Sequence, residues 1–486
     1  MEYLYDKLKK LEYSGIYGFH MPGHKRNGLL TGVKLPYEID ITEIDGFDDL
    51  HHAEGVLRDA QKRAAMAYHA DETHYLINGS TVGLLSAVLG CTQRGNSILM
   101  ARNCHKSVYN AVFLNQLRPV YIYPELLSSG REAEADLNGP VTAEQIEEAL
   151  QKNLDIAAVV ITSPTYDGII SDVHAIADCV HRWNIPLILD EAHGAHFGFH
   201  SYFPKNGNEM GADVVIHSLH KTLPSLTQTA LLHMNGNIAD RERIRMYLGI
   251  LQSSSPSYVL MASMDECIRL IEEKREEIFN RYVDMLQSTR EQLKSMEHLR
   301  LWECPVYDYS KLLISTDGSL ITEEETKKYT GKQLYNDLRE KYLLQLEMAA
   351  PNYAIAMTAP GDTAVGMSRL IAALNEIDGK LAKNDRNESY NSFVSWKKLT
   401  SCMNEQIYSN GEIYKFTNKV KKVVIQESAG YISKEYAYIY PPGIPLIVPG
   451  ERISEGTVRQ IIQYQQTGFD IQGTLEKGKI EVLDNG

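Results

Sequence analysis

The run Asp213-Val-Val-Ile-His-Ser-Leu-His-Lys-Thr222 joins a short β-branched segment to a polar cluster around one lysine. Such a run is typical of a buried strand that carries its last polar residues into a cleft. Lys221 is flanked there by His217, Ser218 and His220. Desolvation disfavours an ammonium ion, so a partly buried lysine can lose its proton, attack a carbonyl and form a Schiff base. A strand end with a solvated lysine is the alternative that this stretch leaves open.

Around this run, short apolar segments alternate with helical ones. The predicted strands are His74–Asn78, Ser97–Met100, Val120–Tyr123, Ile156–Thr162, Pro186–Asp190, Val214–His217 and Thr229–His233. This alternation predicts an α/β fold with a parallel or mostly parallel seven-stranded sheet, covered by helices on both faces. Ligands of such sheets bind beyond the carboxyl ends of the strands. The polar residues expected to gather at that edge are Ser80, His105, Thr165, Asp190 and Lys221.

The rest of the chain divides into further portions. A charged helix from about residue 257 to Met296 bridges to an α+β portion with a helix over Gly331–Leu346 and a strand over Tyr353–Met357. A polar stretch from Lys380 to Asn391 has the composition of a linker. We therefore predict an N-terminal arm over residues 1–50, a large domain over 51–258, a small α+β domain over 259–385 and a C-terminal domain over 386–486.

Composition narrows the class of protein. The chain has 486 residues, of which 43% are hydrophobic and 23% charged, which is typical of a soluble globular protein. Its net charge of −14 argues against a nucleic-acid or anionic-membrane partner and is compatible with a cationic small molecule. The six cysteines form no C-x-x-C pair, and there is no signal peptide or apolar run of about 20 residues. We expect a cytoplasmic protein.

The segment Asn78-Gly-Ser-Thr81 lies where a strand turns into a helix. Hydroxyl groups and free N–H groups at a helix N-terminus can bind a phosphate without a basic side chain. Serine and threonine are also common N-caps, so Ser80 and Thr81 could serve the helix alone.

The segment from Asp190 to His200 combines two acidic residues with His193, His196 and His200. An aspartate at a strand end can pair with a protonated ring nitrogen, as pyridoxal 5'-phosphate (PLP) requires. The histidines also resemble metal ligands, and structural roles for His196 and His200 remain an alternative. We predict no metal, because glycines at 194 and 198 disfavour a regular helix that would align the imidazoles. A phosphate turn, a histidine, an aspartate and a lysine, in that order, are what a PLP enzyme needs.

Motifs along almost the whole chain then identify a family resemblance. They are MPGHK (21–25), DDLHH (48–52), GST (79–81), NCHKS (103–107), SPTYDG (163–168), DEAHGAHF (190–197), HSLHK (217–221), SSSPSYVLMAS (253–263) and YPPGIPL with PGE (440–451). In these motifs the chain resembles the bacterial ornithine/lysine/arginine decarboxylases. These are PLP-dependent enzymes of the aspartate-aminotransferase fold, or fold type I, with a large domain, a smaller α+β domain and a C-terminal domain.

The resemblance implies a role for each matching residue. Lys221 is the Schiff-base lysine, Asp190 the partner of the pyridine nitrogen, and His105 the residue that stacks on the ring. Further cofactor contacts are implied for Ser80, Thr81, Ala192, His193, Ser218, His220, Ser254 and Ser255. Of these, Ser254 and Ser255 would be lent to the phosphate by a neighbouring subunit, which implies a homodimer or a dimer of dimers with shared active sites. Glu427 matches an acidic position near the distal end of the substrate.

The implied reaction is decarboxylation of arginine, lysine or ornithine to a polyamine precursor and CO₂, with His220 or Lys221 donating the proton to Cα. The acidic balance and Glu427 favour a cationic substrate, and arginine is favoured over lysine. The chain begins almost at MPGHK, so it resembles a short form without an N-terminal response-regulator-like domain. Alternatives are another fold-type-I enzyme, such as an aminotransferase with Arg369 as the carboxylate ligand or a lyase, and a non-catalytic PLP-binding protein.

Overall fold

The structure is a computed structural model of the chain. It describes every residue except 1, 18, 23, 28, 30–32, 129–136, 322–327, 384–402, 418, 441–442 and 485–486. The chain folds into two compact units. Unit 1 comprises residues 1–93, 157–161 and 173–281, and unit 2 comprises residues 94–156, 162–172 and 282–486.

A seven-stranded sheet in the order β1-β9-β8-β7-β6-β2-β3 confirms the predicted fold class. β9 runs antiparallel to both of its neighbours, whereas β2–β3 and β7–β8 pair in parallel, so the sheet is mostly parallel. The strands are β1 (Glu72–Leu76), β2 (Ser97–Ala101), β3 (Arg118–Ile122), β6 (Ile156–Thr162), β7 (Leu187–Asp190), β8 (Val214–His217) and β9 (Ala230–Met234).

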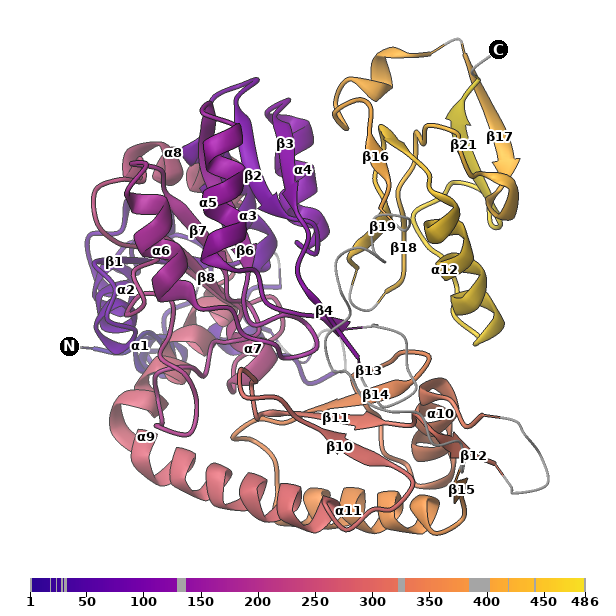
Figure 1. Cartoon of the computed structure of the whole chain (residues 1–486). Helices are drawn as coiled ribbons and strands as arrows, with labels where there is room; N and C mark the ends of the chain where they lie inside the picture. The colour runs from indigo at the N-terminus through magenta and orange to yellow at the C-terminus, as the bar shows by residue number, and fades with distance from the viewer. Residues whose placement is uncertain are drawn as a thin grey trace. The chain divides into compact units, whose positions relative to one another are not determined.

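Helices of unit 1 surround its part of the sheet (Figure 1). They are α1 (Leu4–Tyr13), α2 (Val56–Ala67), α3 (Gly79–Cys91), α6 (Val173–His181), α7 (Leu219–Thr222) and α8 (Arg241–Leu251). Helix α3 is apolar on nearly every face and accordingly lies buried against α8, β8 and β9. A Cβ on Gly83 would lie 2.7 Å from Leu76 Cδ1, and one on Gly90 would lie 2.9 Å from Ile244 Cα. Glycine therefore permits the close packing that fixes α3.

The long helix α9 (Tyr258–Leu293) leads out of unit 1 and into unit 2 (Figure 1). Its backbone is non-helical at Lys274, so two helical segments meet there. The helix ends three residues before the predicted Met296. The bridging helix is thus a feature of the structure, as the sequence predicted.

Unit 2 contains a four-stranded antiparallel sheet in the order β10-β11-β14-β13, against which helix α10 packs. The elements from the first half of the chain are α4 (Lys106–Leu114), β4 (Leu126–Leu127), β5 (Leu137–Asn138) and α5 (Ala143–Lys152). Those that follow α9 are β10 (Arg300–Trp302), β11 (Lys311–Ser315), β12 (Ser319–Leu320), α10 (Gly331–Lys341), β13 (Met348–Ala349), β14 (Tyr353–Met357), α11 (Ala364–Asp378) and β15 (Ala382–Lys383). Both α5 and α10 begin with a capping box, formed by Thr142 with Gln145 and by Thr330 with Gln333.

The C-terminal part of unit 2 is built from short paired strands and one helix. Its elements are β16 (Glu405–Gln406), β17 (Val420–Val424), β18 (Ala437–Tyr438), β19 (Pro445–Ile447), β20 (Glu451–Arg452), α12 (Glu455–Gln466) and β21 (Lys479–Leu483). Ile447, Ile461 and Ile480 lie in a buried apolar cluster of its own. The predicted boundary at 385/386 and most of the predicted linker lie outside the described residues, and the four predicted domain ranges stay predictions.

Several predicted boundaries differ from the observed ones. β1 begins and ends two residues earlier than the predicted His74–Asn78; at its end, Ile77 and Asn78 already form the turn that precedes α3. α10 ends at Lys341 rather than Leu346, since Leu343 has a left-handed backbone with φ of 55°. The predicted strands Ile156–Thr162, Val214–His217 and Tyr353–Met357 are observed with the same limits.

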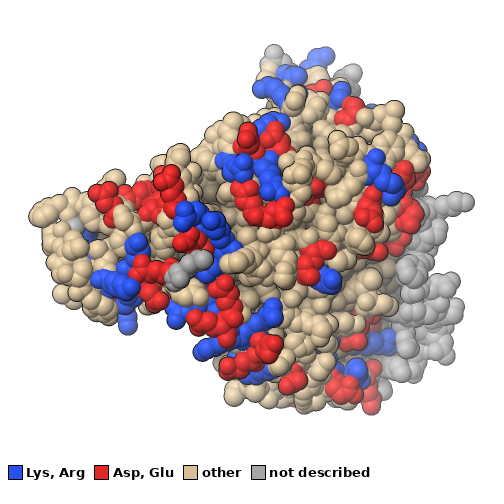
Figure 2. Space-filling view, turned by 90° about the vertical axis from the view of Figure 1, so that its left-hand side faces the viewer, with Lys and Arg blue, Asp and Glu red and all other residues tan. Residues whose placement is uncertain are grey.

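Acidic and basic side chains are interspersed on the face shown in Figure 2. The net charge of −14 is therefore not gathered into one acidic field on that face. Within the described ranges, no helix combines the length and the apolar character needed to cross a membrane.

Candidate active site

Lys221 and Asp190 follow neighbouring parallel strands of unit 1. Asp190 is the last residue of β7 and lies in register with Ile216 of β8, and Lys221 sits in the one-turn helix α7 directly after β8. The Nζ atom of half-buried Lys221 lies 3.1 Å from Nε2 of His193. Parallel strands bring their carboxyl ends to one edge. Lys221, Asp190 and His193 are therefore brought together at that edge.

Asp190 is buried, with only 4% of its surface exposed to solvent. The backbone N–H of Ala192 donates a hydrogen bond of 3.2 Å to its Oδ1 atom. Burial raises the pKa of Asp190, while the nearby Lys221 and the Ala192 N–H act in the opposite direction. A carboxyl group in these surroundings gains from a cationic partner such as a protonated ring nitrogen.

His220 and Ser218 lie beside Lys221 in the sequence and interact with each other. His220 Nδ1 lies 3.1 Å from the carbonyl oxygen of Thr229 and 3.3 Å from Ser218 Oγ. A carbonyl can only accept, so Nδ1 carries the proton and donates it. Burial lowers the pKa of His220; the bond to Thr229 opposes this shift and Lys221 adds to it. A neutral His220 therefore exposes Nε2 as a proton acceptor.

The N-terminus of α3 carries the predicted phosphate turn. Gly79 has a φ of 71°, which favours glycine, and the N-cap Asn78 makes no side-chain capping bond. Ser80 is half-buried and Thr81 exposed. An uncapped helix start with two hydroxyl groups leaves N–H donors for an anion, so this turn fits the phosphate of PLP.

Ser254 and Ser255 are exposed in the loop that follows α8. His51 of the DDLHH motif donates through Nε2 to the carbonyl of the adjoining Ser253, at 2.9 Å. Two motifs that lie about 200 residues apart in the chain are thus joined within unit 1. The hydroxyl groups at 254 and 255 remain accessible on its surface.

His105 belongs to unit 2, where it caps helix α4. Its Nδ1 atom accepts the backbone N–H of Ser107 at 3.2 Å, so in the neutral ring the proton lies on Nε2. The ring is partly exposed. The predicted stacking residue therefore has an orientation that the chain itself fixes.

The turn that carries His105 begins at Arg102, whose guanidinium group is buried. Nε and Nη2 of Arg102 donate to the two carboxylate oxygens of Glu451, each at 3.1 Å. Nη1 donates to the carbonyl oxygen of Pro445 at 2.7 Å, and the Tyr109 hydroxyl donates to the Arg102 carbonyl at 2.6 Å. Glu451 is 1% exposed. This fork-like ion pair gives the late PGE motif a structural role that the sequence alone did not reveal.

Glu427 and Thr165 are also in unit 2. Glu427 is exposed at the end of the short 3-10 helix Ile425–Glu427. Thr165 is buried, and its hydroxyl accepts the N–H of Ile169 at 3.0 Å within the SPTYDG turn. Lys311 donates to the Thr165 carbonyl at 2.9 Å. The predicted Thr165 thus has bonds that hold its own turn.

The histidines of the 190–200 segment lie in turns rather than in a regular helix. The ring of His196 packs edge-on against Phe197 and Phe203, and His200 contacts the side-chain amide of Asn280 at 3.2 Å. In the described part of the chain, no group of three or more His, Cys, Asp and Glu residues is arranged to hold a metal ion. Packing and hydrogen bonding account for His196 and His200.

A buried polar row behind the lysine was not predicted. Glu191 contacts His217, His217 contacts His233, and His233 contacts Thr73. From the sequence, Glu191 was interpreted only as part of a possible metal cluster and His217 as a polar strand end. A histidine inside the apolar run Ala230-Leu-Leu-His-Met234 was the available signal, since such a residue needs a buried partner.

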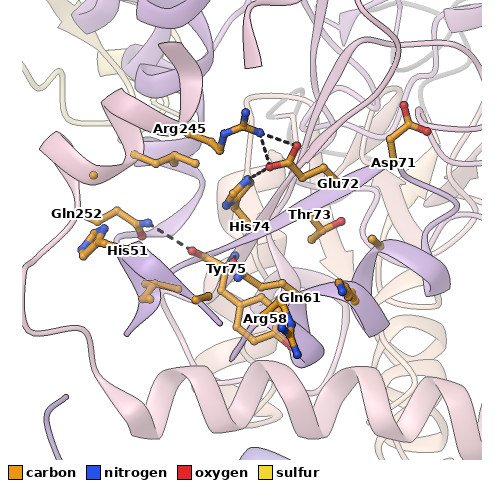
Figure 3. Close-up of a pocket in the computed structure, with 16 residues that line it drawn as sticks. His51, Arg58, Gln61, Asp71, Glu72, Thr73, His74, Tyr75, Arg245 and Gln252 are labelled. Atoms are coloured by element: carbon orange, nitrogen blue, oxygen red, sulfur yellow. Dashed lines mark hydrogen bonds and ion pairs between the residues drawn. The ribbon is translucent and has the colours of Figure 1, made fainter. Parts of the chain in front are cut away.

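A separate pocket of about 510 Å³ opens in unit 1 among α2, β1 and α8 (Figure 3). Its centre holds Glu72, which accepts hydrogen bonds from His74 Nε2 at 2.7 Å and Arg245 Nη1 at 2.8 Å. Burial alone would raise the pKa of Glu72, but these two partners lower it to about 2. Glu72, His74 and Arg245 thus form one paired group in the lining of the pocket.

Comparison with known proteins identifies the family. The model of the Orn/Lys/Arg decarboxylase major domain matches residues 3–337, and that of the C-terminal domain matches residues 399–472. The chain is 33% identical over 99% of its length to an uncharacterised Bacillus subtilis protein, YaaO, of which the match covers 98%. It is 28% identical to the arginine decarboxylase of the same organism, over 97% of this chain and 95% of that protein.

Among solved structures, the lysine decarboxylase LdcF of Francisella novicida is similar with a TM-score of 0.78 and 19% identity. The match covers 99% of this chain and 81% of that one. At this identity the likeness concerns the fold, which is the predicted fold type I. The two family matches show that the chain belongs to the Orn/Lys/Arg decarboxylase family of PLP-dependent amino-acid decarboxylases.

Proposed function

We propose that this protein is an arginine decarboxylase that binds PLP through Lys221. The observation that carries the proposal is the arrangement of Lys221, His193 and buried Asp190 at the ends of β7 and β8. Several relatives that match most of the chain are named arginine decarboxylases, which supports arginine over lysine and ornithine.

The residues of unit 1 fit the cofactor chemically. Lys221 supplies the amine that binds the aldehyde, and Asp190 supplies the carboxyl group for the pyridine nitrogen. The α3 turn with Ser80 and Thr81 supplies donors for the phosphate, and further contacts come from Ala192, His193, Ser218 and His220. His105 is proposed to stack on the ring. When bound, PLP supplies a cationic ring system that accepts the electron pair left on Cα as CO₂ departs.

The chain's own groups then have to manage charge and protons. Asp190, in its carboxylate form, stabilises positive charge on the ring nitrogen through a short-range interaction in a buried environment. Loss of CO₂ leaves Cα in need of one proton per turnover. Lys221 and His193 lie 3.1 Å apart, so a proton can be held between Nζ and Nε2 and delivered from Lys221. His220, whose Nδ1 donates to Thr229, is the second candidate donor, after its Nε2 has taken up a proton.

A cationic substrate side chain would require an acidic partner beyond the reacting centre. Glu427 is exposed and is the residue we propose for this role. An aminotransferase would instead need an arginine for the α-carboxylate. Arg369 donates to the carbonyl oxygens of Tyr342 and Leu343, at 3.1 and 3.2 Å, which favours a role in capping α10.

The test is to measure ¹⁴CO₂ release from carboxyl-labelled arginine, lysine and ornithine in parallel, with the purified protein, PLP and a Lys221→Ala control. We expect release from arginine, stoichiometric amine formation and no keto acid, all abolished in the control. Release from lysine or ornithine alone would overturn the assignment of arginine. A keto-acid product, or no turnover of any substrate while a PLP absorbance band is present, would overturn the reaction.

A further inference from the structure

The buried row behind the active-site edge crosses four adjacent strands. Glu191 follows β7, His217 ends β8, His233 lies in β9, and Thr73 lies opposite it in β1. The contacts are Glu191 Oε2 to His217 Nε2 at 2.5 Å, His217 Nδ1 to His233 Nε2 at 3.0 Å, and His233 Nδ1 to Thr73 Oγ1 at 2.7 Å. All four residues are at most 4% exposed. The row therefore forms a continuous set of hydrogen bonds inside unit 1.

Two directions of donation satisfy these bonds. Each of the three contacts needs one proton, and both nitrogens of each imidazole are engaged. With a carboxylic acid at Glu191, the acid donates to His217, His217 donates to His233, and His233 donates to Thr73. With a carboxylate at Glu191, the Thr73 hydroxyl donates to His233, His233 donates to His217, and His217 donates to Glu191. Both imidazoles are neutral in either direction, and the two forms differ by the one proton that the acid carries.

The surroundings favour the uncharged form. Glu191 Oε2 accepts one further bond, from the backbone N–H of Gly207 at 2.9 Å. Tyr68 packs its ring on both imidazoles, with centroids 4.6 Å from His217 and 4.8 Å from His233. Burial raises the pKa of Glu191 and lowers the pKa of His217 to about 3. A carboxylate with only neutral imidazoles beside it is costly in such an apolar enclosure, so the carboxylic acid is the favoured form of Glu191.

The row is attached to both proposed catalytic groups through the backbone. Glu191 adjoins Asp190 and its backbone N–H donates to the carbonyl of Ile216 at 3.1 Å, while His217 lies four residues before Lys221. We propose that Glu191, as a protonated carboxylic acid, is a positioning residue that holds the ends of β7 and β8 so that Asp190 and Lys221 face the reaction correctly. This proposal rests on the proposed function for its kinetic part and on the structure alone for the protonation of Glu191.

Two substitutions of Glu191 distinguish the effect of its side-chain length from the effect of its acid group. Glu191→Gln keeps the length of the side chain and an uncharged hydrogen-bonding group, and the row can reverse its direction to suit the amide. Glu191→Asp keeps the acid but withdraws it by one methylene group. Glu276→Gln, at an exposed position on α9 in the same unit, is the matched control. The measurements are kcat and KM, the pH titration of the bound cofactor's absorbance, and the infrared carboxylic-acid C=O band of the full-length protein at neutral pH.

We expect Glu191→Gln to remain within about threefold of the wild-type kcat, and Glu191→Asp to lose on the order of 10- to 100-fold with little change in KM. The cofactor titration should shift in Glu191→Asp alone. The infrared band should be present in the wild type and in Glu276→Gln and absent in Glu191→Gln. The infrared result does not depend on any turnover, so it tests the protonation of Glu191 even if the proposed reaction is wrong.

Two outcomes would overturn the inference. Absence of the acid band from the wild type, with Glu191→Gln as impaired as Glu191→Asp, would mean that Glu191 acts as a carboxylate. A Glu191→Asp protein with unchanged kcat and unchanged cofactor titration, whatever its thermal stability, would mean that the row only stabilises the fold.

Discussion

Asp190 and Lys221 lie at the ends of neighbouring strands, but the proposed reaction needs one of them charged and the other neutral. The lysine has to lose its proton before it can act as a nucleophile, whereas the aspartate is useful to a cationic ring as a carboxylate. Burial favours the neutral form of both side chains. A bound cation beside Asp190 would oppose the effect of burial on that group. We therefore expect a charged Asp190 and a neutral Lys221 to occur together only when the cofactor is bound.

Replacement of Asp190 by asparagine tests this assignment. The Asp190→Asn protein keeps the shape of the side chain but cannot stabilise a positive charge on the ring nitrogen. We expect kcat to fall by about 100- to 1,000-fold, as for loss of one preorganised electrostatic partner, while most of the cofactor stays bound. Steady-state kinetics and the cofactor absorbance measure the two effects, with Asp178→Asn on the exposed face of α6 as control. Near-normal turnover in Asp190→Asn would contradict the role.

At the scale of elements, β1 and α8 are joined by Glu72 and Arg245 in the pocket of Figure 3. The folded pKa of Glu72 is about 2, below its ordinary value of 4.5. A carboxyl group with a depressed pKa stabilises the folded state above pH 4.5, and this contribution is lost as the pH falls toward 2. Because Glu72 is partly exposed, solvent screening reduces the contribution to about 1 kcal/mol.

We therefore expect Glu72→Gln to lower the free energy of unfolding by about 1 kcal/mol at pH 7 and by clearly less at pH 3. Chemical denaturation at both pH values measures the difference. Glu242→Gln, on the exposed side of α8, should have little effect at either pH. An equal loss for Glu72→Gln at pH 7 and pH 3 would show that the carboxylate is not the group responsible.

The elements that the sequence predicted with correct limits are those with an unbroken apolar run. Ile156–Thr162 and Val214–His217 are surrounded by polar residues or turns, so their limits follow from local composition. The strand Glu72–Leu76 is harder to delimit because its first three residues, Glu72, Thr73 and His74, are polar. Pairing in the sheet, rather than the side chains of the strand itself, decides where it begins.

The catalytic motif was predictable, but the groups that support it were not. Lys221, Asp190 and His193 stand next to recognisable strand ends, and their meeting follows from the parallel order of β7 and β8. The bond between Arg102 and Glu451 joins residues 349 positions apart in the chain. Such a pair cannot be predicted from the periodicity of the sequence. In the sequence each partner resembles an ordinary surface charge, and only the fold buries both.

At the scale of the whole molecule, the family resemblance predicts that Ser254 and Ser255, which are exposed, contribute to the active site of a neighbouring subunit. Mixing tests this directly. A Lys221→Ala subunit retains the serines, and a Ser254→Ala, Ser255→Ala subunit retains the lysine. If the serines act on the neighbouring subunit, a mixed dimer contains one site with both features. We expect each variant alone to be nearly inactive and their mixture, after dissociation and reassociation, to regain activity.

The control for this experiment is a mixture of the Lys221→Ala and Asp190→Asn variants. Lys221 and Asp190 of one subunit belong to the same active site, so each site of the mixed dimer still carries one of the two substitutions. That mixture should regain nothing. Light scattering of each sample reports the size of the assembly. Failure of the serine mixture to regain activity, in a protein of dimeric mass, would contradict the shared site.

The ion pair between Arg102 and Glu451 also has a consequence for folding during protein synthesis. A ribosome adds about 5–20 residues per second, so Glu451 is made roughly 17–70 s after Arg102. During that interval the turn leading to His105 has no carboxylate for its guanidinium group, and the bonds from Arg102 to Pro445 and Glu451 are missing. A nascent or prematurely ended chain cannot complete this turn. The last tenth of the polypeptide thus supplies the hydrogen-bond partners of a buried guanidinium group in the first quarter of the chain.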